Sequence, residues 1–225
     1  MKRKLSLLFI MLLLCSGILL YSEHDADADE LTLYNAEQIY ELSHPALFYI
    51  RILRSDDTVA SAGTGVTITP EGTAVTAYHV IKDAGRIEGT YPDGRVVSPI
   101  EVIGFDEVTD AAVLKLPAPG DQPYPALTIR ETAVKYGEKV FALGYPIKDT
   151  PIITEGIINA PKAEVNGRDR ILTSAQIASG MSGGPLLDQQ GRLSGIISGS
   201  LRTMNNIHLV VDMSDVRKLL SENQQ

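Results

Sequence analysis

Short runs of apolar and β-branched residues, separated by Gly, Pro and Asp, dominate the chain from residue 46 onward. Apolar runs of this length between turn residues are typical of β-strands. Turn signals such as Pro70-Glu71-Gly72 and Pro92-Asp93-Gly94 stand between them. The pattern predicts strands at 46–54, 65–69, 73–77, 86–91, 96–105 and 111–116, and further strands at 139–145, 152–160, 170–174, 185–188, 193–198 and 207–212.

A proline-rich stretch at 117–123 divides these strands into two sets of similar size. Such a stretch is typical of a linker. We therefore expect a first strand-rich half at about 46–116 and a second at about 124–213. Two halves of this kind form either two packed β-barrels or a large β-sandwich, and the periodicity alone leaves both open.

Two short helices are predicted at the ends of the strand-rich region. Asn35 followed by Gln38 resembles a helix-starting cap pair, and the short apolar face behind it ends before His44-Pro45. Ser214 stands where it can cap a last helix at about 214–222.

The N-terminus has the pattern of an export signal. A Lys/Arg cluster precedes seventeen uncharged residues, Leu5 to Tyr21, and then a polar tract with Ala26-Asp27-Ala28. This pattern predicts a signal peptide over 1–28, and the apolar run also reaches the lower limit for a membrane anchor. A cleaved leader and a retained anchor are both open. Either one directs residues 29–225 out of the cytoplasm, as a secreted protein or one held on the outer face of a bacterial cytoplasmic membrane.

Composition narrows the classes of protein. With 225 residues, 44% of them apolar, the chain can bury a substantial core. The net charge of −8 is spread along the chain, which speaks against a nucleic-acid partner that needs a basic face. The single cysteine, Cys15, lies in the leader, so the remaining chain forms no internal disulfide. We predict neither a metal site nor a cofactor, because no histidines or cysteines are paired at ligand spacing.

The candidate chemistry centres on Ser182, which stands between glycines in Gly180-Met181-Ser182-Gly183-Gly184. A serine hydroxyl is a weak nucleophile that needs a base and an orienting carboxylate. His79 follows the predicted strand 73–77, where a base is held firmly and stays accessible. Asp110 directly precedes an apolar strand, where a partly buried carboxylate needs a partner such as a histidine N–H. The chain order His, Asp, Ser is one of the known orders of the catalytic triad.

The same glycine-rich segment also fits Gly-x-Ser-x-Gly, the nucleophile elbow of α/β-hydrolases. That fold places its acid and then its histidine after the serine. The only later histidine is His208, and too little chain follows Ser182 for the intervening strand–helix units. The order and the length therefore argue against this alternative.

Six ordered motifs stand at intervals along the chain: Gly63-Thr64-Gly65-Val66, Thr76-Ala77-Tyr78-His79-Val80-Ile81, Thr109-Asp110-Ala111-Ala112-Val113-Leu114, Leu143-Gly144-Tyr145-Pro146, Glu155-Gly156-Ile157-Ile158 and Gly180-Met181-Ser182-Gly183-Gly184-Pro185-Leu186. With these motifs, the chain from about Pro45 to Leu220 resembles the protease domain of the HtrA/Deg group of trypsin-like serine proteases. The resemblance implies an all-β fold of two six-stranded β-barrels with short terminal helices and a site in the cleft between the barrels.

The resemblance implies roles for these residues. His79 would take the proton of Ser182, Asp110 would orient His79, and the backbone N–H groups of Gly180 and Ser182 would form the oxyanion hole. The expected activity is an exported serine endopeptidase that cleaves unfolded or flexible proteins through an acyl-enzyme. The alternative is a catalytically silent domain of the same fold that binds peptides or serves as a scaffold in the cell envelope.

Two departures from the family limit how far its residue roles can be assigned to this chain. Met181 stands where the family usually has Asn and where the digestive enzymes have Asp. A methionine cannot pair with a new N-terminal amine, so activation by N-terminal insertion is not expected. Both a formed and a collapsed resting conformation of the oxyanion loop are compatible with the sequence. We also expect no peptide-binding PDZ domain after the protease domain.

By resemblance, the primary substrate pocket involves Gln176 and the segment Ile197-Ser198-Gly199-Ser200. Position 176 carries no carboxylate, so we expect small or medium uncharged side chains rather than Lys or Arg. His208 is expected at the surface or in a structural role. The alternative is that it helps to hold an acidic side chain of the substrate. Family members often form homotrimers, and Tyr34 and Tyr40 are candidates for such packing.

Overall fold

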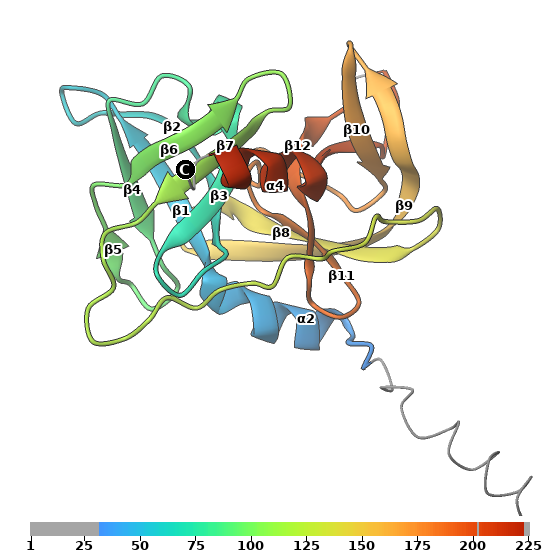
Figure 1. The fold of residues 1–225 in the computed structure, drawn as a ribbon, viewed down its shortest axis with the longest axis horizontal. Helices are drawn as coiled ribbons and strands as arrows, with labels where there is room; N and C mark the ends of the chain where they lie inside the picture. Colours follow the sequence, from blue (N-terminus) through green and yellow to red (C-terminus); the bar gives the residue numbers. More distant parts are fainter. Residues whose placement is uncertain (1–31, 202, 223–225) are drawn as a thin grey trace, which may run out of the picture. The chain divides into compact units, whose positions relative to one another are not determined.

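The computed structural model describes residues 32–201 and 203–222. All of its strands and helices belong to one compact unit that runs from Tyr34 to Gln225 (Figure 1). The predicted leader at 1–28 lies outside the described residues. Within the described part of the chain, every helix is too short or too polar to span a membrane.

The N-terminal half forms a seven-stranded antiparallel sheet in the order β5-β4-β1-β2-β3-β7-β6. Apolar side chains such as Phe48, Ile50 and Leu114 are buried in its interior. The strands are β1 Leu47–Leu53, β2 Val59–Thr67, β3 Thr73–Ala77, β4 Arg86–Thr90, β5 Val96–Val97, β6 Glu101–Asp106 and β7 Ala111–Lys115.

The C-terminal half forms a closed six-stranded barrel in the order β10-β13-β12-β11-β8-β9. Val140, Ile158 and Leu186 belong to its buried interior. The strands are β8 Lys139–Ile147, β9 Thr150–Val165, β10 Arg168–Thr173, β11 Pro185–Asp188, β12 Leu193–Ser200 and β13 His208–Asp212. In Figure 1 this barrel, coloured yellow to red, lies beside the blue-to-green N-terminal sheet.

A third apolar cluster joins the two halves. Leu47 and Val66 of the N-terminal sheet pack in one buried group with Phe141, Leu143 and Leu187 of the barrel. Burial of a side chain of this size contributes about 1.5–3 kcal/mol. This shared core fixes the two halves against each other, so residues from both can contribute to one site.

Helix α2, Ala36–Ser43, begins with the predicted capping box. The N–H of Gln38 donates to Asn35 Oδ1 at 2.9 Å, and the N–H of Asn35 donates to Gln38 Oε1 at 3.0 Å. The buried Ile39 anchors the helix in the shared core, and the short 3-10 helix η1, His44–Ala46, then leads into β1.

Helix α4, Met213–Glu222, packs on β6 and β7 of the N-terminal sheet as well as on β12 and β13 (Figure 1). The prediction that Ser214 caps this helix is wrong. The carboxylate of Asp212 accepts the N–H of Ser214 at 2.7 Å, so Asp212 is the capping residue.

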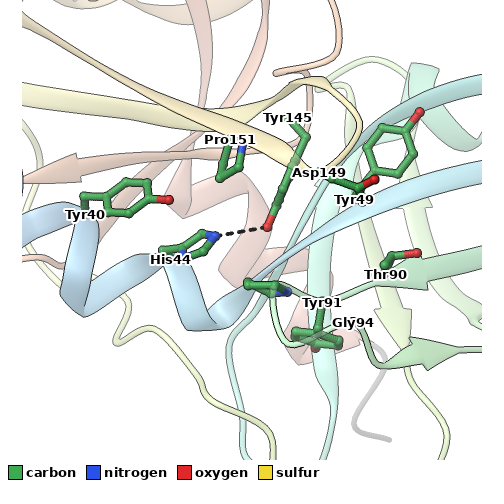
Figure 2. A pocket seen from close by; sticks show the side chains of 10 residues that line it. Tyr40, His44, Tyr49, Thr90, Tyr91, Gly94, Tyr145, Asp149 and Pro151 are labelled. Carbon is green, nitrogen blue, oxygen red and sulfur yellow. Dashed lines mark hydrogen bonds between the residues drawn. The ribbon is translucent and has the colours of Figure 1, made fainter.

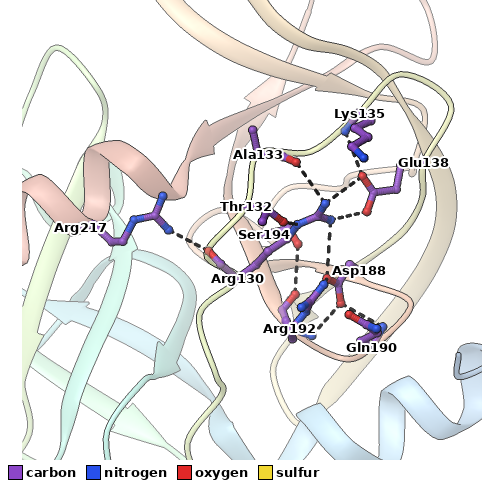
Figure 3. A network of polar contacts seen from close by, with 10 residues as sticks. All are labelled: Arg130, Thr132, Ala133, Lys135, Glu138, Asp188, Gln190, Arg192, Ser194 and Arg217. Atoms are coloured by element: carbon purple, nitrogen blue, oxygen red, sulfur yellow. Dashed lines mark hydrogen bonds and ion pairs between the residues drawn. The ribbon is translucent and has the colours of Figure 1, made fainter. Parts of the chain in front are cut away.

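Ion pairs connect the segment before β8 with the β11–β12 turn, and a hydrogen bond connects it with α4 (Figure 3). The guanidinium of Arg130 pairs with Glu138 and lies 3.6 Å from the buried carboxylate of Asp188. Arg192 binds the same carboxylate at 2.7 Å, and Arg217 of α4 donates to the carbonyl oxygen of Arg130 at 2.8 Å. The network fixes the segment through which the chain enters the barrel.

The predicted all-β fold class with short terminal helices is confirmed, and the prediction of two six-stranded barrels is correct for the C-terminal half. The halves differ in detail, because the C-terminal barrel is closed with six strands whereas the N-terminal half has seven strands and is a half-barrel. The predicted strand at 96–105 is split into β5 and β6 around Ser98-Pro99. Proline lacks the N–H that a strand ladder needs, so the strand ends before it.

A cavity of about 400 Å³ lies beside the end of α2 and is lined by tyrosines and by His44 (Figure 2). The His44 ring stacks on Tyr40 with the ring centroids 4.8 Å apart, and its Nε2 lies 3.4 Å from the hydroxyl oxygen of Tyr145. Burial lowers the pKa of His44, because loss of water disfavours the charged imidazolium.

This lowered pKa predicts acid sensitivity. Below about pH 6.5 the unfolded chain binds a proton at His44 before the folded protein does, so folding stability falls as the pH decreases. We expect the melting temperature to drop between pH 8 and pH 5 by a smaller amount in His44→Gln than in the wild type. Equal drops in calorimetric scans of both proteins would contradict this role for His44.

Candidate active site

Adjacent strands bring His79 and Asp110 together. Strand β3 ends at Ala77, and the one-turn helix α3, Tyr78–Ile81, carries His79. Ala77 pairs in register with Ala111, the first residue of β7, so Asp110 lies beside the start of α3. The N–H of Tyr78 donates to the carbonyl oxygen of Asp110 at 3.0 Å and fixes this arrangement.

The carboxylate of Asp110 accepts hydrogen bonds from two residues. His79 Nδ1 lies 2.9 Å from Oδ2 and 3.1 Å from Oδ1, and the backbone N–H of His79 donates to Oδ1 at 2.9 Å. The hydroxyl of Ser198 donates to Oδ2 at 2.5 Å. The Asp110 side chain is 8% exposed and that of His79 is 47% exposed. The aspartate is therefore enclosed while the histidine ring still reaches solvent.

Electrostatics keep Asp110 ionised. Burial alone would raise the pKa of its carboxyl group, but the hydrogen bonds and charge of His79, with the hydrogen bond from Ser198, outweigh this effect and lower the pKa. An ionised carboxylate against Nδ1 favours the tautomer in which Nδ1 carries the proton. The Nε2 of His79 is then free to accept a proton from another group.

The backbone around Ser182 docks on the strands that precede His79. The carbonyl oxygen of Ser182 accepts the N–H of Thr64 on β2 at 2.9 Å, and the N–H of Gly183 donates to Ile197 at 2.8 Å. A Cβ at Gly183 would lie 2.1 Å from Thr76 Oγ1 and 3.0 Å from the amide nitrogen of Ala77. The segment after the serine thus touches the end of β3, two residues before His79.

The hydroxyl of Ser182 makes no hydrogen bond to any other described residue by the usual distance limits. Catalytic hydrogen bonds commonly shorten only when a substrate is bound, so this geometry is compatible with a nucleophile–base pair. The structure brings Ser182 and the His79–Asp110 pair to the same region of the molecule through their backbones.

The Gly180–Gly184 loop leaves two backbone donors unpaired. The N–H of Met181 donates to Ala178 at 3.1 Å, and the N–H of Gly184 donates to Met181 at 2.9 Å. The N–H groups of Gly180 and Ser182, in contrast, meet no acceptor in the described part of the chain. Gly180 has a φ of +92°, and a Cβ there would lie 2.5 Å from the carbonyl oxygen of Tyr145, so only glycine fits.

Met181 is fully buried in the core of the C-terminal barrel. Its sulfur accepts the N–H of Ala178 at 3.3 Å, while its own N–H donates to the carbonyl of the same residue. The loop is therefore held from within by a packed thioether. Sequence reasoning identified Met181 as unusual but could not tell that its side chain points into the barrel.

The residues predicted for the substrate pocket have different environments. The amide of Gln176 donates to the carbonyl of Ser174 and to Asn206 Oδ1, both at 3.3 Å. Ile197 is a buried core residue, and the Ser198 hydroxyl is directed to Asp110, a contact that sequence reasoning missed.

At the C-terminal end of β12, Ser200 Oγ lies 2.8 Å from Nδ1 of His208. His208 is buried rather than on the surface, and burial lowers its pKa. Its Nε2 has no hydrogen-bond partner among the described residues. As for metals, residues 32–201 and 203–222 contain no group of three or more His, Cys, Asp or Glu side chains close enough to hold an ion.

Comparison with known proteins identifies a matching family and several relatives. A family model described as a trypsin-like peptidase domain matches residues 63–196. Protease Do-like 1, chloroplastic, from Arabidopsis thaliana is 33% identical over 175 residues, which are 71% of this chain and 40% of that protein. Serine endoprotease DegS from Escherichia coli K12 is 37% identical over 152 residues, 66% of this chain and 42% of that protein.

Among solved structures, the serine endoprotease from Yersinia pestis superposes with a TM-score of 0.74 at 27% identity. The match covers 85% of this chain and 67% of that chain. The chain spans less than half the length of the curated relatives it matches, from 29% to 45%.

The burial of Met181 leads to a prediction about stability. Met181→Leu keeps the volume and should change the free energy of unfolding by less than about 1.5 kcal/mol. Met181→Asp places a carboxylate among apolar side chains and should cost about 3 kcal/mol or more. Urea unfolding of both variants measures the difference. A Met181→Asp protein as stable as Met181→Leu would show that the side chain does not occupy the barrel core.

Proposed function

The chain belongs to the trypsin-like peptidases and is of the HtrA/Deg type, and from this premise we propose that it is a serine endopeptidase with Ser182 as its nucleophile. The observation that carries the proposal is the 2.9 Å contact between His79 Nδ1 and the buried Asp110 carboxylate. The Ser182 loop, which docks on the strand before His79, has two N–H groups without an acceptor among the described residues. Together these features supply a base, its orienting partner and donors for an anionic oxygen.

In the proposed mechanism, His79 Nε2 takes the hydroxyl proton of Ser182 as the serine oxygen attacks a peptide carbonyl. The imidazolium then gives this proton to the leaving amine, and the acyl-enzyme remains. A water molecule, deprotonated by the same nitrogen, hydrolyses the acyl-enzyme and restores the serine. Asp110 stabilises the imidazolium and holds the ring, while Ser198 helps to hold Asp110.

The N–H groups of Gly180 and Ser182 are proposed to bind the oxygen that becomes negative in the tetrahedral intermediate. A donor of this kind typically contributes about 3 kcal/mol to transition-state stabilisation. Neither N–H group has an acceptor among residues 32–201 and 203–222, which supports this role, because a donor already bonded within the protein could not bind the substrate.

We further propose that the protein acts outside the cytoplasm on unfolded or flexible protein segments. The predicted leader and the relatives named as periplasmic serine endoproteases support this location. Assembly into a homotrimer stays a prediction. Tyr34 and Tyr40 pack against the shared core of this chain, which leaves each ring only partly exposed for a partner.

A fluorophosphonate probe tests the proposed nucleophile. We expect the wild type to be labelled and Ser182→Ala to be unlabelled, while His79→Ala should be labelled at least about 10⁴-fold more slowly. Ser194→Ala is a matched control, because the hydroxyl of this buried serine donates to the carbonyl oxygen of Arg192, away from Ser182, and its loss should leave labelling unchanged. A folded wild type that resists the probe would favour the catalytically silent peptide-binding domain.

The substrate pocket predicts the preferred side chain before the scissile bond. Gln176 is neutral and its amide is already bonded, so a cationic side chain would find no carboxylate there. We expect peptides with Ala, Ser or Val at this position to have a kcat/KM at least about tenfold higher than peptides with Lys or Arg. Gln176→Asp should reduce this difference in kcat/KM between the two classes of peptide. A wild type that cleaves best after Lys or Arg would overturn the assignment of the pocket.

A further inference from the structure

Thr64 connects the N-terminal sheet to the loop that carries Ser182. It lies on β2, is fully buried, and uses every polar group it has. Its N–H donates to the carbonyl of Ser182 at 2.9 Å, and its carbonyl accepts the hydroxyl of Thr76 at 2.8 Å. Its hydroxyl donates to the carbonyl of Gly180 at 2.9 Å and accepts the N–H of Tyr145 at 2.9 Å.

We propose that Thr64 is a positioning residue that fixes the Gly180–Ser182 backbone with the N–H group of Ser182 turned toward the substrate. This inference rests on the proposed peptidase function. It assigns Thr64 no contact with substrate, because the residue acts through the loop alone.

The argument follows from the planarity of peptide groups. In a trans peptide the C=O and N–H point in opposite directions, so two bonds, one at each end, fix its orientation. The Gly180–Met181 peptide is held by the Thr64 hydroxyl at its C=O and by Ala178 at its N–H. The Ser182–Gly183 peptide is held by the N–H of Thr64 at one end and by Ile197 at the other.

The peptide between these two is then oriented by its neighbours. Its carbonyl, on Met181, accepts the N–H of Gly184 at 2.9 Å, so its N–H, on Ser182, must point to the opposite side. Thr64 is the only residue that bonds to both flanking peptides among the described residues. Loss of its hydroxyl releases one of them.

Water cannot take the place of this hydroxyl, because the surroundings are closely packed. A Cβ at Gly144 would lie 2.7 Å from the Cα of Met181 and 2.9 Å from Thr64 Oγ1. A valine at position 64 would fill the same volume and leave the carbonyl of Gly180 and the N–H of Tyr145 without partners. Buried groups of this kind are costly to leave unpaired, so the loop would turn to satisfy them elsewhere.

The test compares Thr64→Val and Thr64→Ser with Thr67→Val. Thr67 lies on the same strand, is equally buried, and bonds through its hydroxyl to Tyr91 at 2.5 Å, away from the loop. For Thr64→Val we expect kcat to fall about 10²-fold or more with little change in KM and with the pH profile unchanged. Thr64→Ser should retain most of the wild-type kcat, and Thr67→Val should lose stability without losing kcat.

A Thr64→Val protein with wild-type kcat would overturn the inference, and so would equal losses of kcat in Thr64→Val and Thr67→Val. If Thr64→Val does not fold, Thr64→Cys replaces it, and its weakly bonding thiol should give a kcat below that of Thr64→Ser. A wild type without peptidase activity refutes the proposed function separately. In that case, amide hydrogen exchange at residues 178–184 tests whether Thr64 fixes the loop, and the exchange must be faster in Thr64→Val than in Thr67→Val.

Discussion

A side chain on Gly183 would lie 2.1 Å from the hydroxyl oxygen of Thr76 and 2.2 Å from the carbonyl oxygen of Thr64. This close backbone approach lets the serine loop of the C-terminal barrel rest on β2 and β3 of the N-terminal sheet. A φ of +85° at Gly183 adds a second reason for glycine, since side chains disfavour that conformation. The distance between the serine and the histidine of the other half depends on this contact, and the shared apolar core maintains it.

The His79–Asp110 pair depends on a different kind of constraint. A carboxylate that is 8% exposed needs hydrogen-bond donors, and Asp110 obtains them from the ring and backbone of His79 and from Ser198. Ser198 belongs to the barrel, whereas the other two donors belong to His79 on α3 of the N-terminal half. Asp110 thus has all of its hydrogen-bond donors only when both halves are in place.

Local sequence patterns were sufficient to select His79, Asp110 and Ser182 as candidates, because each stands at a strand end or in a glycine-rich loop. The patterns also predicted β3 and β11 with their observed bounds. They missed the beginning of β2, whose first residues are mostly small, and the pairing of Ser198 with Asp110. That pairing depends on how two halves dock, and no spacing along the chain encodes the distance between residues 88 positions apart. The orientation of the Met181 side chain could not be predicted either, because it also depends on packing between segments that are distant in the sequence.

Met181 changes how the serine loop is held. A carboxylate at this position would need a cation, and its contribution would depend on pH and on the availability of that cation. A buried thioether needs only apolar neighbours and one weak donor, and the barrel core and the N–H of Ala178 provide both. Thr64 and Tyr145 add neutral hydrogen bonds on the other side of the loop. The loop is therefore anchored without ionised groups, so its geometry depends on packing of the two halves rather than on a charge created by cleavage of the chain.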